Sequence, residues 1–120
     1  MKYLKTIFGL IILSSMLFTS CSVKPTEIDV SKLETVCDHV DALEKVCNAM
    51  EKLKPTPGVT NGKVFDSIFQ DKDSPEAVYL EQLLLKHREI KEILNKKFTK
   101  IERRSCEKYE WAYTYVKENF

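Results

Sequence analysis

The residues of this chain that could do chemistry are its thiols and imidazoles, four cysteines and two histidines among 120 residues. Thiolates and neutral imidazoles are the usual zinc ligands in proteins, but a zinc site needs two well-spaced pairs of them. The densest group is Cys37-Asp38-His39 with Asp41. Adjacent residues of a helix point about 100° apart, so these side chains cannot converge on one ion. We therefore predict no metal site and no cofactor.

The histidines and glutamates are also candidates for general acid–base catalysis. His39 is expected to be a solvated helix residue, and His87, on an apolar helix face, a hydrogen-bonded histidine at the edge of the core. The glutamates of the segment 86–108 include Glu89, Glu92, Glu102 and Glu107. Solvated helix faces have this composition, and no nucleophile motif accompanies them. The chain is thus predicted not to be an enzyme. The alternative is an enzyme or small-ligand protein that uses His87 and its neighbouring glutamates.

The first 20 residues have the pattern of a targeting segment. Lys2 and Lys5 precede or border the apolar run Thr6–Phe18, and small polar residues follow as far as Cys21. A positive start, a short apolar run and a small-residue end are typical of a secretory signal peptide. The alternative is an uncleaved membrane anchor, although a spanning helix needs about 20 apolar residues.

The end of this segment resembles the lipobox of bacterial lipoproteins. Phe18-Thr19-Ser20-Cys21 carries the resemblance, with Phe18 where leucine is usual and Leu17 one place earlier. It implies that Cys21 is diacylated, becomes the first residue and anchors the protein to a membrane of the bacterial cell envelope. Because Ser22 is not an acidic retention residue, the outer membrane is expected if the host has one. Two or three acyl chains make such an anchor irreversible in practice. The alternative is a secreted soluble protein that begins at Cys21.

The charge balance excludes one class of function. The chain has 19 Lys plus Arg and 18 Asp plus Glu, and without residues 1–20 it has 17 and 18, a net charge of −1. A nucleic-acid binder that works by bulk charge needs a strongly basic domain. The expected organisation is a signal peptide over 1–20, a flexible tether over 21–30 and one helical domain over 31–120.

A first helix is expected over 32–54. Ser31-Lys32-Leu33-Glu34 fits a capping box, in which the Ser and Glu side chains satisfy free backbone donors. Lys52 and Lys54 complement the negative end of the helix, and Pro55 stops it. The apolar stripe has alternating spacings of three and four residues: Leu33, Val36, Val40, Leu43, Cys47 and Met50.

A second long helix is expected to begin at Ser74-Pro75, with the serine as N-cap and the proline in the first turn. Since neither Gly nor Pro follows Pro75, this helix either continues to about Glu118 or bends near 103–105. A short helix is expected within 62–71. The second long helix has an apolar face of Leu80, Leu83, Leu84, His87, Ile90, Leu94, Phe98 and Ile101.

These elements predict an all-α fold, an antiparallel helical hairpin or a three-helix bundle with a short crossing helix. The domain resembles the small bacterial lipoproteins built as a disulfide-closed helical hairpin, which implies a fold and no activity.

With Cys21 acylated, three cysteines remain in an oxidising compartment. Cys37 and Cys47 are ten residues apart on one helix, so their Cα atoms are about 15 Å apart. A disulfide tolerates at most about 7 Å, so an intrachain bridge must include Cys106. In an antiparallel hairpin the end of the second helix returns to the level of Cys37, and we predict Cys37–Cys106. Cys47 is expected to be a small buried side chain, and the alternative is a free thiol that joins two copies.

Aromatic residues occupy every second position of the last segment, at Tyr109, Trp111, Tyr113 and Tyr115. In a strand all four would share one face. In a helix Tyr109, Ala112, Tyr113, Val116 and Phe120 would continue the core face, while Trp111 and Tyr115 would project from the opposite side. We predict Trp111 and Tyr115 as partner-binding residues, the alternative being that they pack on the short helix.

The sequence therefore predicts a membrane-anchored lipoprotein that acts as a protein-interaction or scaffolding module in the cell envelope. The expected partners are the membrane, through Cys21, and a protein, with no nucleic acid.

Overall fold

The structure is a computed structural model that describes residues 23–120, and this part of the chain is helical with no strand. The predicted all-α fold is confirmed. The predicted signal peptide and the acylated Cys21 lie outside the described residues. The elements are the 3-10 helices η1 (Pro25–Glu27) and η2 (Val30–Lys32) and the α-helices α2 (Val36–Leu53), α3 (Asp66–Phe69), α4 (Pro75–Lys97), α5 (Lys100–Arg104) and α6 (Tyr109–Asn119).

Helix α2 begins four residues later than predicted. Its capping box is formed by Thr35 and Asp38, since each side chain accepts a hydrogen bond from the backbone N–H of the other residue. The expected cap Ser31 lies in η2, and its backbone N–H and hydroxyl both donate to Asp29. The predicted end of the helix is confirmed, because α2 stops at Leu53 before Pro55.

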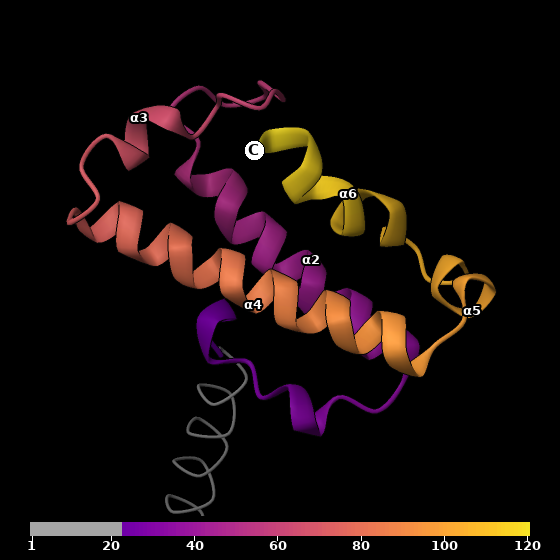
Figure 1. The fold of residues 1–120 in the computed structure, drawn as a ribbon. Coiled ribbons are helices and arrows are strands. Elements are labelled where there is room, and N and C mark those ends of the chain that lie inside the picture. The colour runs from indigo at the N-terminus through magenta and orange to yellow at the C-terminus, as the bar shows by residue number, and fades with distance from the viewer. Residues whose placement is uncertain (1–22) are drawn as a thin grey trace, which may run out of the picture.

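Helices α2 and α4 form the predicted antiparallel pair, which crosses the centre of the molecule (Figure 1). Ser74 caps α4 through a hydrogen bond from the Ala77 N–H, as predicted, and Pro75 occupies the first turn. The buried side chains of the pair include Val40, Leu43, Val46, Met50, Leu80, Leu83, Ile90 and Leu94. A close-packed core of this kind fixes how the two helices face each other.

Helix α4 ends at Lys97, earlier than either predicted alternative. Phe98 is extended, and Thr99 starts α5 with a second capping box in which its hydroxyl accepts from the Glu102 N–H. The prediction that Ile101 belongs to the apolar face is wrong, because this side chain is 84% exposed. A side-chain hydrogen bond spans the junction between α4 and α5, because the Arg103 guanidinium donates to the carbonyl of Phe98.

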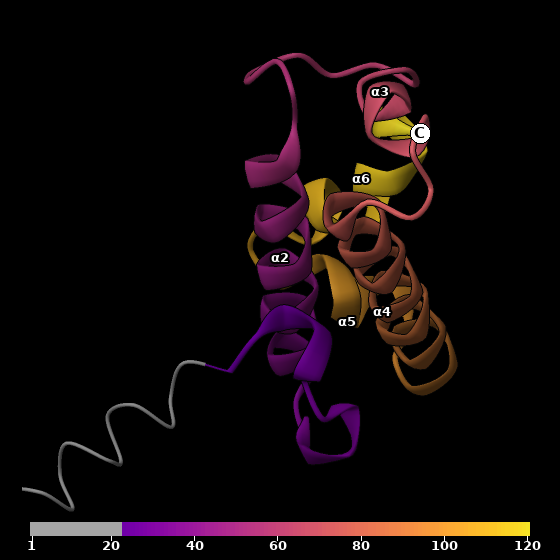
Figure 2. The same cartoon turned by 90° about the vertical axis from the view of Figure 1, so that its left-hand side faces the viewer.

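The aromatic segment forms helix α6, and the strand alternative is wrong. Lys108 precedes it with a φ of 68°, in the left-handed region, so the chain turns sharply and α6 packs back on α2. Figure 2 shows α6 behind the α2–α4 pair.

The predicted crossing helix is present, although α3 has only four residues. Phe65, just before it, is buried and stacks on Phe120 with 4.6 Å between ring centroids. The turn that leads into this segment uses Gly58 at a φ of +83°, which favours glycine.

The segment predicted as a flexible tether packs on the helical domain from Pro25 onward. η1 contacts both α2 and α4, and the carbonyl of Ile28 accepts a hydrogen bond from Lys86 at 2.9 Å. η1 and α6 lie on opposite sides of the α2–α4 pair in both views (Figures 1 and 2). No helix among residues 23–120 is long and apolar enough to cross a membrane.

Candidate functional site

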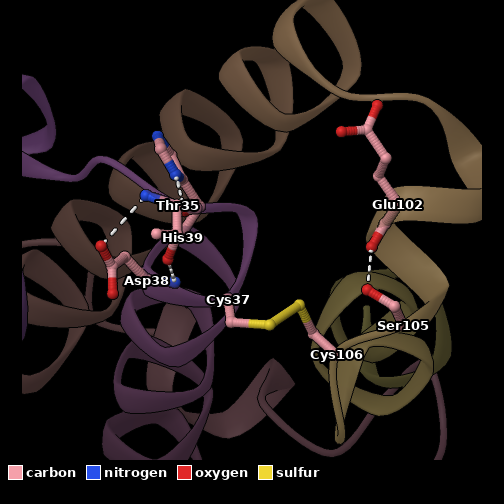
Figure 3. Close-up of a disulfide and its surroundings, with 7 residues drawn as sticks. All are labelled: Thr35, Cys37, Asp38, His39, Glu102, Ser105 and Cys106. Carbon is pink, nitrogen blue, oxygen red and sulfur yellow. Dashed lines mark hydrogen bonds between the residues drawn. A yellow bond between two sulfur atoms is a disulfide. The ribbon is translucent and has the colours of Figure 1, made fainter.

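The predicted disulfide joins Cys37, in the first turn of α2, to Cys106, in the connection between α5 and α6 (Figure 3). Their Cα atoms are 5.4 Å apart and 69 residues separate them in the sequence. The prediction that these two cysteines pair is confirmed. Cys47 is buried, as predicted, and forms no disulfide within residues 23–120.

The structure corrects the predicted position of His39, which lies close to this disulfide. It was expected on the solvated face of α2 but is completely buried. Its Nδ1–H donates to the carbonyl of Thr35 at 2.7 Å (Figure 3). Its ring forms a T-shaped pair with Phe98, with 5.3 Å between the ring centroids. Its Nε2 has no hydrogen-bond partner among the residues that the structure describes. Phe98, extended at the end of α4, thus helps to bury His39, which α2 alone would leave exposed to solvent.

His87 and Cys47 meet at one backbone carbonyl of α6. The His87 Nε2–H donates to the oxygen of Ala112 at 2.8 Å, and the Cys47 thiol donates to the same oxygen at 3.4 Å. The prediction of a hydrogen-bonded histidine at the core is confirmed. Three helices therefore meet at the Ala112 carbonyl: α2 through Cys47, α4 through His87 and α6 through Ala112 itself.

This junction is not arranged as a nucleophile and its base. Burial raises the pKa of Cys47, and the nearby charges of Glu44 and Glu51 raise it further, so the thiol keeps its proton. Burial lowers the pKa of His87 to about 4, which leaves the ring neutral at pH 7. Both groups donate to the same acceptor, so neither takes a proton from the other.

A cavity of about 420 Å³ lies beside His87, between α4 and the second half of α6. Its volume is within the usual range of small-molecule sites. The α4 side supplies Leu84, His87, Arg88, Lys91, Glu92 and Asn95, and the α6 side supplies Val116 and Phe120. The cavity thus combines an apolar part with several charged side chains. Arg88 and Lys91 were not predicted as site residues, although their spacing places them on the same helix face as His87 in the sequence.

The structure also corrects the predicted position of Tyr115. It was predicted to project away from the core as a partner contact, but only 1% of it is exposed, and it cannot serve as a surface contact. Its hydroxyl donates to Glu51 at 2.6 Å, and Glu51 also forms an ion pair with Lys54, whose side chain is buried. This cluster was not predictable from local sequence patterns, because its members come from α2 and α6.

Trp111 is the predicted contact residue that does reach the surface. It is 37% exposed, its ring meets the edge of Tyr115 at 5.4 Å between centroids, and the Lys108 ammonium lies 5.9 Å from its centroid. Phe120, predicted to continue the core face, is equally exposed.

The carboxylates expected to be solvated, Glu89, Glu92, Glu102 and Glu107, are exposed. Within residues 23–120 no three His, Cys, Asp or Glu side chains come close enough together to hold a metal ion.

Comparison with known proteins gave no further guide to this site, because no family model, no curated protein and no solved structure matches the chain.

Proposed function

We propose that the chain is a lipid-anchored protein of a bacterial cell envelope that acts as a protein-interaction or scaffolding module. The observation that carries the proposal is the bridge between Cys37 and Cys106, because disulfides persist in oxidising compartments outside the cytosol. The segment Phe18-Thr19-Ser20-Cys21, which is similar to a lipobox, supplies a means of export and attachment.

The intact mass of the protein from bacterial membranes tests the anchor and its compartment together. We expect the mass of residues 21–120 plus acyl groups, with a gain of two hydrogens on reduction. The control variant Cys21→Ser is expected to lack the acyl groups. A wild-type mass that retains residues 1–20 without acyl groups would contradict the anchor, and no change on reduction would contradict the oxidising compartment.

Trp111 supports the interaction role. It is exposed on α6, and α6 lies on the side of the α2–α4 pair opposite to η1. An anchor at Cys21 precedes η1 by only a few residues, so Trp111 is proposed to face away from the membrane. Tryptophan is enriched among the residues that dominate protein interfaces.

Site-specific cross-linking in cells tests this role. A photoreactive residue at position 111 is expected to give a discrete cross-linked product, and the same residue at Lys32, exposed in η2, is expected to give none. Equal labelling from both positions, or no product from position 111, would contradict the proposal.

The alternative function, an enzyme or small-ligand protein built on His87, predicts the opposite response to two variants. For this comparison the photoreactive residue stands at position 108, which is exposed beside Trp111. For an interaction module, Trp111→Ala weakens the complex captured from that position and His87→Ala leaves it intact. A complex that survives Trp111→Ala and is lost in His87→Ala would favour the alternative.

A further inference from the structure

The cavity between α4 and α6 has a cationic rim. Arg88 and Lys91 line it on successive turns of α4, with Glu92 beside them. The ion pairs among residues 23–120 are Lys54–Glu51, Lys86–Glu89 and Arg104–Glu110, so none of them neutralises Arg88 or Lys91. Among the side chains that line the cavity, two are cations and one is a carboxylate, so these side chains carry an excess of positive charge.

Lys91 also contacts an aromatic ring of α6. Its ammonium lies 4.5 Å from the ring centroid of Tyr113, and the hydroxyl of Tyr113 donates to Asn95, another residue of the cavity wall. A cation over an aromatic face keeps its charge available to a further ligand on its other side.

Apart from its charged residues, the cavity is lined by apolar and neutral side chains. Leu84, Val116 and Phe120 line it, and His87 is neutral because its buried ring has a lowered pKa. A second hollow of about 540 Å³ adjoins this one, and Leu84 and Arg88 line both, so Arg88 stands between the two.

We propose that this cavity binds a small organic anion, a monocarboxylate with a short hydrocarbon part. The carboxylate accepts hydrogen bonds from Arg88 and Lys91 at the rim, and the hydrocarbon lies against Leu84, Val116 and Phe120. Guanidinium and ammonium donors form the strong, charge-assisted bonds that carboxylates prefer. The proposal goes beyond the interaction role and does not depend on the lipid anchor.

Hexanoate is the probe that tests it. The full chain in micelles of an uncharged detergent is titrated with hexanoate, and the NMR signals of the Val116 methyl groups and the His87 ring are followed. We expect a saturable shift of both. Arg88→Gln and Lys91→Gln are each expected to raise the dissociation constant about tenfold, since each removes one charge-assisted hydrogen bond.

Two controls separate this site from general adsorption. Lys96→Gln removes an exposed cation of the same helix that does not line the cavity, and it is expected to leave the dissociation constant unchanged. Hexan-1-ol, with the same chain length and no charge, is expected to bind at least about tenfold more weakly. The proposal is overturned if hexanoate gives no saturable shift, if hexan-1-ol binds as well, or if Lys96→Gln weakens binding as much as Arg88→Gln.

Discussion

His87 makes the stability of the protein depend on pH. Burial lowers its pKa to about 4; the hydrogen bond to Ala112 opposes this shift and the charge of Lys91 adds to it. The unfolded chain binds the proton at about pH 6.5, well before the folded chain does. The contribution of His87 to the free energy of unfolding is therefore fully present above about pH 6.5, and it is lost as the pH falls toward 4. We expect the free energy of unfolding to drop by about 2 kcal/mol between pH 7 and pH 5 through this residue, measured by urea denaturation.

The variant His87→Gln isolates this contribution, because an amide can still donate to Ala112 but does not titrate. Its stability is expected to change less over the same interval. The pKa values of Asp38 and Glu102 are also lowered, by hydrogen bonds to their capping partners, but both carboxylates titrate below this window. Equal slopes for the wild type and His87→Gln would contradict the prediction.

The buried ammonium of Lys54 is compensated by the carboxylate of Glu51, which also accepts a hydrogen bond from Tyr115. Burial alone would raise the pKa of Glu51, but hydrogen bonds from Lys54 and Tyr115 and the charge of Lys54 hold it below its usual value. Tyr115→Phe removes one of these bonds and is expected to cost about 1 kcal/mol in the free energy of unfolding. Glu51→Ala leaves the Lys54 ammonium buried without its carboxylate and is expected to cost about 2–3 kcal/mol. Urea denaturation of both variants at pH 7 checks the order, and an equal or reversed cost would contradict it.

At the scale of single elements, the start of α2 gives a direct test of which cap operates. Thr35 accepts from the Asp38 N–H, so Thr35→Ala is expected to reduce the free energy of unfolding by about 1 kcal/mol. Ser31→Ala removes only an exposed hydrogen bond to Asp29 and is expected to cost less than about 0.5 kcal/mol. Thermal denaturation of the two variants distinguishes them, and a larger loss in Ser31→Ala would place the cap at the position first predicted from the sequence.

Element types were predictable because the decisive signals are local. Apolar spacing, the Ser74 cap and Pro55 lie within a turn or two of what they determine, and the predicted helices are present. The end of α4 was also predictable, because the sequence Thr99-Lys100-Ile101-Glu102 fits a capping box that starts a new helix. The continuous apolar face that seemed to extend to Ile101 obscured this signal.

The faces of α6 were not predictable in the same way. Its buried positions are Tyr109, Ala112, Tyr115 and Asn119, whereas periodicity alone placed Tyr115 outside. The rotation of this helix is determined by the left-handed Lys108, the disulfide and the junction at Ala112, which involve residues far apart in the chain. His39 was misplaced for the same reason, since Phe98, just after the end of α4, packs against it.

For the whole molecule, the disulfide closes a layered arrangement in which α2 and α4 lie between η1 and α6. A bridge across 69 residues removes much of the freedom of the unfolded chain, a stabilisation of about 4 kcal/mol in the chain-entropy model. The bridge attaches α6 at its start, and the stack of Phe120 on Phe65 attaches it at its end. The α2 and α4 helices supply most of the side chains of the shared core, so we expect the pair to stay packed without this closure.

Replacing both bridge cysteines, Cys37→Ser with Cys106→Ser, is therefore expected to loosen α6 before α4. Amide hydrogen exchange is the measurement, because it reports local opening segment by segment. We expect the amides of α6 to lose protection by a larger factor than those around Leu83 and Ile90 in α4. The matched control Cys47→Ala removes a buried thiol but keeps the bridge, so the difference between α6 and α4 is expected to stay small. If the double variant loses protection uniformly in both helices, α6 and the α2–α4 pair unfold as one unit, and the bridge stabilises the molecule as a whole rather than the position of α6.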